Sequence, residues 1–148
     1  MAMIIRKYHL KDQQALLDLL KLNTPKYFSV AEQSDFIAYL KSSLEDYFVV
    51  ELRDEVVGCG GVNYFLSENL ACISWDIIHP KYQNQGIGKV LLKYRIDQIF
   101  SNPDIQSIVV RTSQHVSIFY EKAGFQLIRI VENYWALGYD LYEMRLKK

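Results

Sequence analysis

The sequence predicts an α/β (mixed α+β) domain in which about four helices pack on the faces of one mixed sheet of about seven strands. Two observations lead to this prediction. Apolar residues recur at helical spacing in four segments, whereas seven other segments are short and rich in β-branched and aromatic residues. The segments follow one another in the order β-α-α-β-β-β-α-β-α-β-β, so helices and strands must share one layered core.

The first half of the chain is predicted to form a strand, two helices and a three-stranded meander. Met3–His9 is a strand, and Lys11–Leu22 is a helix that ends before the following proline. Val30–Leu44 is a second helix. Three antiparallel strands separated by short polar turns follow, at Tyr47–Leu52, Glu55–Phe65 and Leu70–Ile78. The glycines from Gly58 to Gly61 predict a bulge or close packing in the middle strand.

The second half of the chain is predicted to alternate helices and strands. Its first helix runs from about Gln85 to Phe100 and is expected to turn one apolar face toward the sheet, namely Ile87, Val90, Leu91 and Tyr94. The remaining predicted elements are a strand at Gln106–Thr112, a helix at Val116–Ala123 closed by Gly124 as a left-handed cap, and strands at Phe125–Val131 and Tyr139–Leu146.

Composition narrows the classes of protein to which the chain can belong. Its 148 residues suffice for one domain with a core of its own, and 50% of them are hydrophobic. Seventeen basic residues balance seventeen acidic ones, which argues against nucleic acid as a partner. No segment approaches the roughly 18 apolar residues of a membrane span, and no secretory signal is evident. With Cys59 and Cys72 as its two cysteines, we expect a cytoplasmic protein without a membrane partner.

The segment HPKYQNQGIGKVLLKY (His79–Tyr94) carries the clearest chemical signal. A strand ends where this segment starts and a helix begins near Gln85, so the loop between them directs backbone N–H groups and the positive end of the helix dipole toward one point. Gly86 and Gly88 lack Cβ atoms, so a diphosphate fits against the backbone there, and Lys89 adds a positive charge. The loop matches neither the dinucleotide-binding fingerprint nor the P-loop, because both need glycine where this chain has other residues.

The pattern that remains, Gln83-x-x-Gly86-x-Gly88, resembles the acyl-CoA-binding motif [QR]-x-x-G-x-[GA] of the GNAT superfamily of N-acetyltransferases. Two further segments resemble the same family. SIFYEKAGF (Ser117–Phe125) is similar to its helix-then-strand segment, and ENYWALGYDLYEMRL (Glu132–Leu146) is similar to its last two strands. The predicted order of elements also resembles the GNAT order over almost the whole chain.

The resemblance implies a GNAT fold, an N-acetyltransferase activity and acetyl-CoA as the co-substrate, with no metal. It implies a mostly antiparallel sheet with a V-shaped splay, in which pantetheine pairs with exposed strand backbone. The residues that it assigns to the cofactor are Asp76, Ile77 and Ile78 on the strand; Gln83, Asn84, Gln85, Gly86, Ile87, Gly88 and Lys89 in the loop and helix start; and Ser113, Phe119 and Tyr120 near the second signature.

The resemblance also implies catalytic roles. Tyr120 matches the family tyrosine that protonates the departing CoA thiolate, with a purely packing role as the alternative. Asp76 is the best single candidate for the base, and regular strand alternation places it on one face with Ser74 and Ile78. An ordered water, or a carboxylate that only holds the splay open, is the alternative. Ser113 stands where the family often has an asparagine, which weakens the case for a cofactor contact there.

The acceptor implied by the resemblance is the primary amine of a small molecule or peptide, bound between the first two helices and the central sheet. The aromatic residues expected in that pocket are Tyr27, Phe28, Tyr64, Trp75, Tyr134 and Trp135. An exposed aromatic final strand suggests a homodimer.

Two other functions fit the same sequence. A GNAT-like domain that binds acyl-CoA as a sensor, without turnover, would keep the phosphate loop but lack a base. Ile108 and Ser113 favour this alternative, because they stand where some relatives carry a glutamate and an asparagine. A structural interaction domain would bind no CoA.

Overall fold

The computed structural model describes residues 2–148, and within that range the chain forms seven strands and four α-helices in the predicted order. None of these helices combines the length and the apolar character that crossing a bilayer requires. The strands are β1 (Met3–Lys7), β2 (Asp46–Leu52), β3 (Glu55–Phe65), β4 (Leu70–Ile78), β5 (Ser107–Thr112), β6 (Gln126–Ala136) and β7 (Tyr139–Lys147). The helices are α1 (Gln13–Leu22), α2 (Glu32–Ser42), α3 (Ile87–Phe100) and α4 (Ser117–Lys122).

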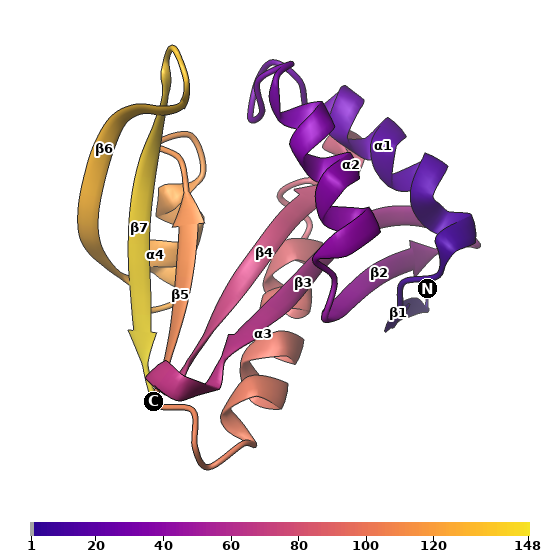
Figure 1. Ribbon diagram of the computed structural model, residues 1–148. Helices are drawn as coiled ribbons and strands as arrows, with labels where there is room; N and C mark the ends of the chain where they lie inside the picture. The colour runs from indigo at the N-terminus through magenta and orange to yellow at the C-terminus, as the bar shows by residue number, and fades with distance from the viewer. Residues whose placement is uncertain (1) are drawn as a thin grey trace.

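The strands form one sheet with the order β1-β2-β3-β4-β5-β7-β6. Neighbouring strands are antiparallel except β4 and β5, which are parallel. β4 and β5 pair only as far as Ile73 and Val110, and beyond this point they diverge (Figure 1). The mixed, mostly antiparallel sheet with a V-shaped splay is therefore confirmed.

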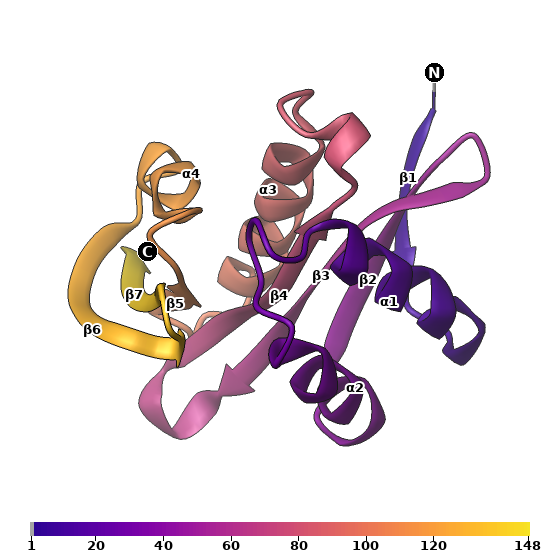
Figure 2. The same ribbon diagram turned by 90° about the horizontal axis from the view of Figure 1, so that it is seen from above.

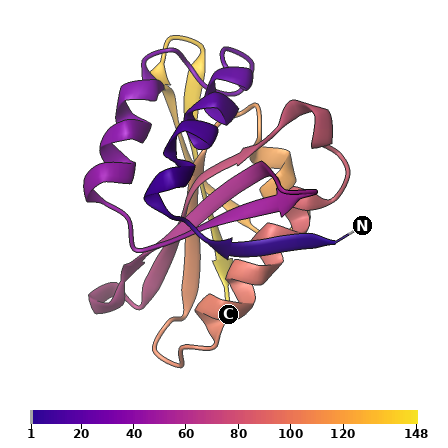
Figure 3. The same cartoon turned by 90° about the vertical axis from the view of Figure 1, so that its right-hand side faces the viewer.

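The helices cover opposite faces of this sheet. α1 and α2 lie on one face, whereas α3 and α4 lie on the other (Figure 2). The view onto the β1 edge shows the same separation between α1 and α2 on one side and α3 on the other (Figure 3). One apolar cluster joins α1 and α2 to the sheet around Phe36 and Tyr47, and another joins α3 and α4 to it around Leu92 and Tyr120. Both helices of the second layer are thus anchored beside the splay.

The buried face of α3 differs from the predicted one. Ile87 and Leu91 are buried as expected, but Val90 and Tyr94 are 43% and 42% exposed. The buried face instead continues through Arg95, which has no exposed surface. The prediction for Val90 and Tyr94 was wrong because it sought apolar residues only, and an arginine occupies the next core position on this helix.

At the end of the sheet opposite β1, the edge strand is β6 rather than the final strand. β7 lies between β5 and β6, so both of its edges are paired. β6 also continues to Ala136, beyond its predicted end at Val131. The expectation of an exposed final strand was therefore wrong, because the chain reverses after β6 and inserts its last strand into the sheet.

Asp12, which the sequence places at the start of the first helix, forms an ion pair. It lies in a short 3-10 turn before α1 and is 5% exposed. Arg6 on β1 donates two hydrogen bonds of 2.9 Å to its two carboxylate oxygens, and two more, of 3.0 and 2.8 Å, to Glu51 on β2. The contacts tie the start of α1 to the outer edge of the sheet.

Candidate active site

A β-bulge interrupts β4 just beyond the point where it leaves β5. Trp75 has a φ of 50°, which is rare for a bulky residue, and the register of β4 with β3 shifts opposite it, between Cys59 and Gly61. The hydroxyl of Tyr47 donates a hydrogen bond of 2.8 Å to the carbonyl oxygen of Trp75 and so holds the bulge from β2. The close packing predicted for the glycine-rich segment of β3 is confirmed, because a Cβ on Gly58, Gly60 or Gly61 would lie less than 3.0 Å from a neighbouring atom.

The bulge changes which side chains of β4 share a face. Ser74 donates a hydrogen bond of 2.8 Å to Asn63, which also accepts one of 2.6 Å from Tyr39 on α2. Asp76 instead points to the opposite face, toward α3. The prediction that regular alternation groups Ser74 with Asp76 was therefore wrong, because the extra residue at Trp75 reverses the pattern.

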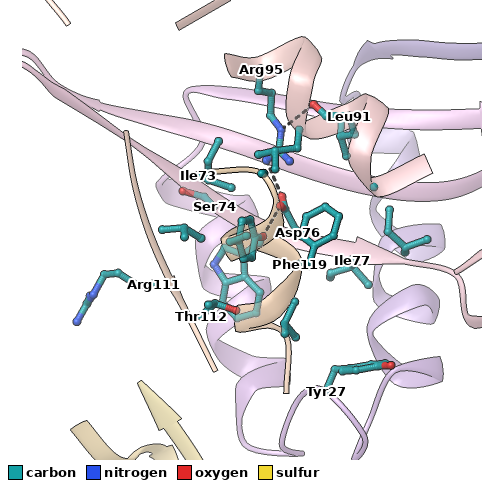
Figure 4. Close-up of a pocket in the computed structure, with 18 of the residues that line it drawn as sticks. Tyr27, Ile73, Ser74, Asp76, Ile77, Leu91, Arg95, Arg111, Thr112 and Phe119 are labelled. Atoms are coloured by element: carbon teal, nitrogen blue, oxygen red, sulfur yellow. Dashed lines mark hydrogen bonds and ion pairs between the residues drawn. The ribbon is translucent and has the colours of Figure 1, made fainter. Parts of the chain in front are cut away.

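Asp76 is the centre of a group of three side chains, here called the Asp76 triad. Its Oδ1 accepts a hydrogen bond of 2.5 Å from Nη1 of Arg95 on α3, and its Oδ2 accepts one of 2.5 Å from the hydroxyl of Tyr120 on α4. Figure 4 shows the Arg95 side chain descending from α3 onto Asp76. Arg95 is fully buried and Tyr120 is 2% exposed, whereas 16% of the Asp76 side chain is exposed. Asp76 is thus the member most open to a ligand.

The surrounding backbone is shaped to accept Arg95. Its Nη1 also donates a hydrogen bond of 3.0 Å to the Gly61 carbonyl, and its Nε donates one of 3.3 Å to the Leu91 carbonyl. Its Nη2 is buried and, among residues 2–148, has no hydrogen-bond partner. A Cβ on Gly60 would lie 2.8 Å from Nη1 of Arg95 and would also collide with Asp76. The glycine at position 60 is therefore required for this ion pair.

Burial and charge keep the proton on Tyr120. Burial raises the pKa of the Tyr120 hydroxyl well above its ordinary value near 10, and the Asp76 carboxylate raises it further, whereas Arg95 lowers it. Burial disfavours the charged form of Arg95, but Asp76 outweighs this effect and raises the Arg95 pKa. In the resting triad Arg95 is therefore a guanidinium cation and Tyr120 a protonated phenol.

The loop before α3 presents open backbone at the start of the helix. Gly86 is the N-cap, with a φ of 86°, and a Cβ on it would have no heavy atom within 4 Å. A Cβ on Gly88 would lie 3.3 Å from the ring of Phe119, so this glycine also allows α3 and α4 to approach each other. The backbone at Gly86 is the more open of the two.

The side chain of Gln83 fixes the position of this loop. Its Nε2 donates hydrogen bonds of 2.8 Å to Asn23 Oδ1 and 3.0 Å to the carbonyl of Ile78. Asn23 itself donates 3.1 Å to the same carbonyl. The motif glutamine thus joins the end of β4, the end of α1 and the loop into one rigid corner.

A cavity of about 1240 Å³ occupies the splay, and all three members of the Asp76 triad line it. One wall comes from the second half of β4 and the start of α3, and the other comes from the end of β5 and from α4. Figure 4 shows Arg111 and Thr112 on the β5 side, across from Ser74 and Asp76. Among residues 2–148, no group of three or more His, Cys, Asp or Glu side chains is placed to hold a metal ion.

Comparison with known proteins identifies the family. Residues 43–127, which include β4, the loop, α3, β5 and α4, match the acetyltransferase (GNAT) domain. The chain belongs to the GNAT acetyltransferase family. The match confirms the resemblance seen in the motifs and covers the whole Asp76 triad.

Three known proteins show how far this GNAT chain resembles others. An amino-acid acetyltransferase of Pasteurella multocida is 26% identical over 128 residues, which cover 86% of this chain but only 28% of that protein. An N-alpha-acetyltransferase of Sulfurisphaera tokodaii is 26% identical over 167 residues, which cover 95% of this chain and 90% of that protein. An aminoglycoside 6′-N-acetyltransferase, solved in complex with coenzyme A, shares the fold with a TM-score of 0.76 and 16% identity, over 97% and 96% of the chains.

The structure brings most of the predicted cofactor residues of this GNAT domain to the cavity. Those that line it are Asp76, Ile77, Ile78, Gln83, Asn84, Gly86, Gly88, Lys89, Ser113, Phe119 and Tyr120. Gln85 is exposed and bonds to the Lys81 carbonyl, and Ile87 is 6% exposed within an apolar cluster, so neither lines the cavity. Contact between these residues and CoA stays a prediction.

The aromatic residues predicted for the acceptor pocket divide into two groups. Those that line the cavity are Tyr27, Phe28, Trp75 and Trp135. Tyr64 lies outside it, and its hydroxyl donates 2.6 Å to Asp46. Tyr134 is also outside, 46% exposed, and accepts a hydrogen bond of 2.8 Å from Arg111.

Arg95 is the site residue that sequence analysis missed. It lies four residues after Leu91 and four before Ile99, both of which are buried on the same helix. A lone arginine at a core position of an amphipathic helix indicates a buried partner of opposite charge. This spacing was the available signal, and it would have directed attention to Asp76 on the strand facing the helix.

Proposed function

We propose that this protein is an N-acetyltransferase that moves the acetyl group of acetyl-CoA directly to a primary amine. The observation that carries the proposal is the cavity in the splayed sheet, which connects open backbone at the start of α3 with the Asp76–Tyr120 pair. Membership of the GNAT family supports the same activity. The acceptor is the amine of a small molecule or a peptide, in line with the amino-acid and N-alpha-acetyltransferases that the chain resembles.

The residues present fit a CoA thioester. Beyond Ile73 the backbone of β4 no longer pairs with β5, so the β5-facing backbone at Asp76, Ile77 and Ile78 would pair with the pantetheine amides like an added strand, apart from the Ile78 carbonyl, which Gln83 and Asn23 already occupy. The open backbone at Gly86 and the positive end of α3 would hold the pyrophosphate. The coenzyme A bound by the structural relative supports acetyl-CoA as co-substrate.

In the reaction, Asp76 and Tyr120 would take complementary roles. Asp76 would accept a proton from the attacking amine, and Tyr120 would donate one to the departing thiolate. The two groups lie on different elements but share one hydrogen bond. Ser113, 6% exposed at the end of β5, would contact the cofactor from the opposite wall.

Binding and turnover test the proposal in sequence. Acetyl-CoA should raise the melting temperature, because a ligand of the folded state stabilises it by about 2.7 kcal/mol at a hundredfold excess over Kd. A panel of amines should then produce free CoA thiol and a product heavier by one acetyl group. Thermal protection without thiol release from any amine would instead support an acyl-CoA sensor. No protection at millimolar acetyl-CoA would contradict both functions.

Two glycines provide a matched test of the pyrophosphate loop. Gly86 and Gly138 have φ values of 86° and 83°, and a Cβ on either would have no heavy atom within 4 Å. The backbone strain of an alanine should therefore be similar at both positions. We expect Gly86→Ala to weaken acetyl-CoA binding at least about tenfold, or about 1.4 kcal/mol, by calorimetry. Gly138→Ala, in the β6–β7 turn, should bind like the parent; equal affinities would contradict the loop assignment.

We also propose a homodimer that pairs through the β6 edge. Leu127, Ile128 and Ile130 on this strand are 50%, 45% and 49% exposed, and an apolar edge strand is suited to pairing with a second copy. Ile130→Lys should convert the dimer to a monomer in light-scattering measurements. A monomeric parent protein at micromolar concentration would contradict this assembly.

A cytoplasmic location follows from the same proposal. Cys59 and Cys72 are free thiols, as is usual in a reducing compartment. Fractionation of cells that express the tagged protein would test the location.

A further inference from the structure

The acid and the base of the proposed reaction are already bonded to each other. The Tyr120 hydroxyl donates to Oδ2 of Asp76 at 2.5 Å, so the proton that would go to the thiolate rests against the carboxylate that would receive the amine proton. Both side chains line the cavity, and Asp76 has 16% of its side chain exposed there. An amine at the cavity can therefore contact the carboxylate from the open side while Tyr120 contacts it from α4.

We propose that Asp76 and Tyr120 act as one proton relay, which carries the proton lost by the amine to the sulfur of CoA, with Arg95 as the positioning residue of the relay. The inference rests on the proposed acetyl transfer and specifies how its protons move. It differs from an arrangement in which an independent base and an independent acid exchange their protons with solvent.

The relay balances the reaction. When the amine nitrogen bonds to the acetyl carbon and the carbon–sulfur bond breaks, the nitrogen loses one proton and the sulfur gains one. Tyr120 gives its hydroxyl proton to the sulfur, and Asp76 takes a proton from the nitrogen. In the same transition state the carboxyl proton crosses the hydrogen bond to the Tyr120 oxygen. Both side chains end in their starting states, and no oxidant or reductant takes part.

The contact of Arg95 is suited to this role. A guanidinium usually grips a carboxylate with two parallel hydrogen bonds, which would engage both oxygens of Asp76. Arg95 instead uses Nη1 alone, on Oδ1, and its buried Nη2 has no hydrogen-bond partner among residues 2–148. The single contact leaves Oδ2 to Tyr120. Arg95 thus orients the carboxylate without blocking the proton path.

A double-mutant cycle tests the relay. Asp76→Asn cannot carry a proton, and Tyr120→Phe removes the hydroxyl, so each should lower kcat by about 10²–10⁴. If the two residues form one relay, the kcat of the double variant should be no lower than that of the less active single variant. Independent acid and base groups would instead multiply their losses to about 10⁴–10⁸, and that result would overturn the relay. All assays are run well below the melting temperature of each variant, with acetyl-CoA affinity measured in parallel.

A second measurement needs no variant and so remains decisive if Asp76→Asn fails to fold. Single-turnover rates of the parent enzyme are measured in mixtures of H₂O and D₂O with a slow amine. A relay moves more than one proton in the transition state and predicts a curved dependence of the rate on deuterium fraction; a linear dependence would overturn it.

Arg95→Lys tests the positioning role. It should lower kcat with little change in the acetyl-CoA KM, whereas an unchanged kcat would overturn that role. No turnover of the parent with any amine would overturn the proposed function, and turnover with multiplied losses would overturn the relay alone.

Discussion

Two groups in this molecule contain the same three residue types in different arrangements. The Asp76 triad lines the cavity in the splay. Tyr8, Asp12 and Arg6 lie together at the β1 edge of the sheet, where β1 leads toward α1. In both groups an arginine contacts an aspartate, at 2.5 Å in the triad and 2.9 Å at the edge. Composition alone therefore does not distinguish a catalytic group from a structural one.

The hydrogen bonds of the two groups do distinguish them. At the edge, Arg6 grips both oxygens of Asp12, and the His9 backbone N–H donates a further bond of 2.8 Å to the same carboxylate. The hydroxyl of Tyr8 is buried there and, within the described chain, has no hydrogen-bond partner. In the Asp76 triad the arginine touches one oxygen and the tyrosine takes the other. A carboxylate fully engaged by fixed donors serves as an anchor, whereas one shared with a phenol can exchange protons.

Removing each arginine should have the largest effect on stability, because Arg95 is fully buried whereas Arg6 is partly exposed. Arg95→Met leaves Asp76 without its counter-charge in a buried site and should cost about 3–5 kcal/mol in unfolding free energy. Arg6→Met should cost less, because the Arg6 side chain is itself 25% exposed, so its loss lets water reach the Asp12 carboxylate, which also keeps its hydrogen bond from the His9 N–H. Urea denaturation measures both.

The combined variant Asp76→Asn with Arg95→Met controls for simple loss of packing. Because neither charge is then left unpaired, it should recover part of the stability lost by Arg95→Met alone. An Arg6→Met protein that is as unstable as the Arg95→Met protein would contradict the distinction between the two pairs.

The stabilisation that the Arg6–Asp12 ion pair provides should be lost at acid pH. The hydrogen bonds from Arg6 lower the pKa of Asp12, although burial opposes the shift. Its stabilising contribution is therefore complete above the unfolded-state pKa of about 3.9 and is lost as the pH falls through the lower folded-state value. We expect Asp12→Asn to cost about 2 kcal/mol at pH 7.

The stability that Asp12→Asn loses should depend on pH, and this dependence tests whether the charge of Asp12 stabilises the edge. The difference between the parent and Asp12→Asn, from urea unfolding, should shrink below about pH 4. The kcat of the variant at pH 7 should equal that of the parent, because Asp12 does not line the cavity. A difference in stability that stays constant between pH 7 and pH 3 would show that the charge of Asp12 is not what stabilises this edge.

The comparison also explains what sequence analysis could and could not predict. The order of elements, the loop before α3 and the glycine cap after α4 depend on local patterns, and a single sequence displays those patterns directly. The bulge at Trp75 depends on how β3 and β4 pair, so regular alternation assigned Ser74 and Asp76 to one face. Arg95 was overlooked because arginines are usually solvated, and its burial depends on a carboxylate 19 residues away.

The smallest effect is expected on the alkaline side of the rate profile. Burial and the Asp76 carboxylate raise the pKa of Tyr120 well above 10, so the phenol stays protonated when an ordinary tyrosine would ionise. Because the protonated form is the active one, kcat should show no decline caused by Tyr120 up to about pH 10. A steady-state profile with saturating amine measures this. A decline in kcat centred near pH 9 that disappears in Tyr120→Phe would contradict the assignment.

The most direct test of the central claim, that the Tyr120 hydroxyl takes part in the chemistry, compares Tyr120→Phe with Tyr8→Phe in the acetyl-transfer assay. Each change removes one buried hydroxyl beside an aspartate and keeps the ring. We expect Tyr120→Phe to lower kcat by about 10²–10⁴, with nearly unchanged acetyl-CoA affinity and a stability loss of about 1–3 kcal/mol. Tyr8→Phe should keep full activity and lose no stability, because its hydroxyl has no hydrogen-bond partner in the described chain. A Tyr120→Phe enzyme that retains more than about a third of the parent rate, far above the range for a lost general acid, would contradict the account.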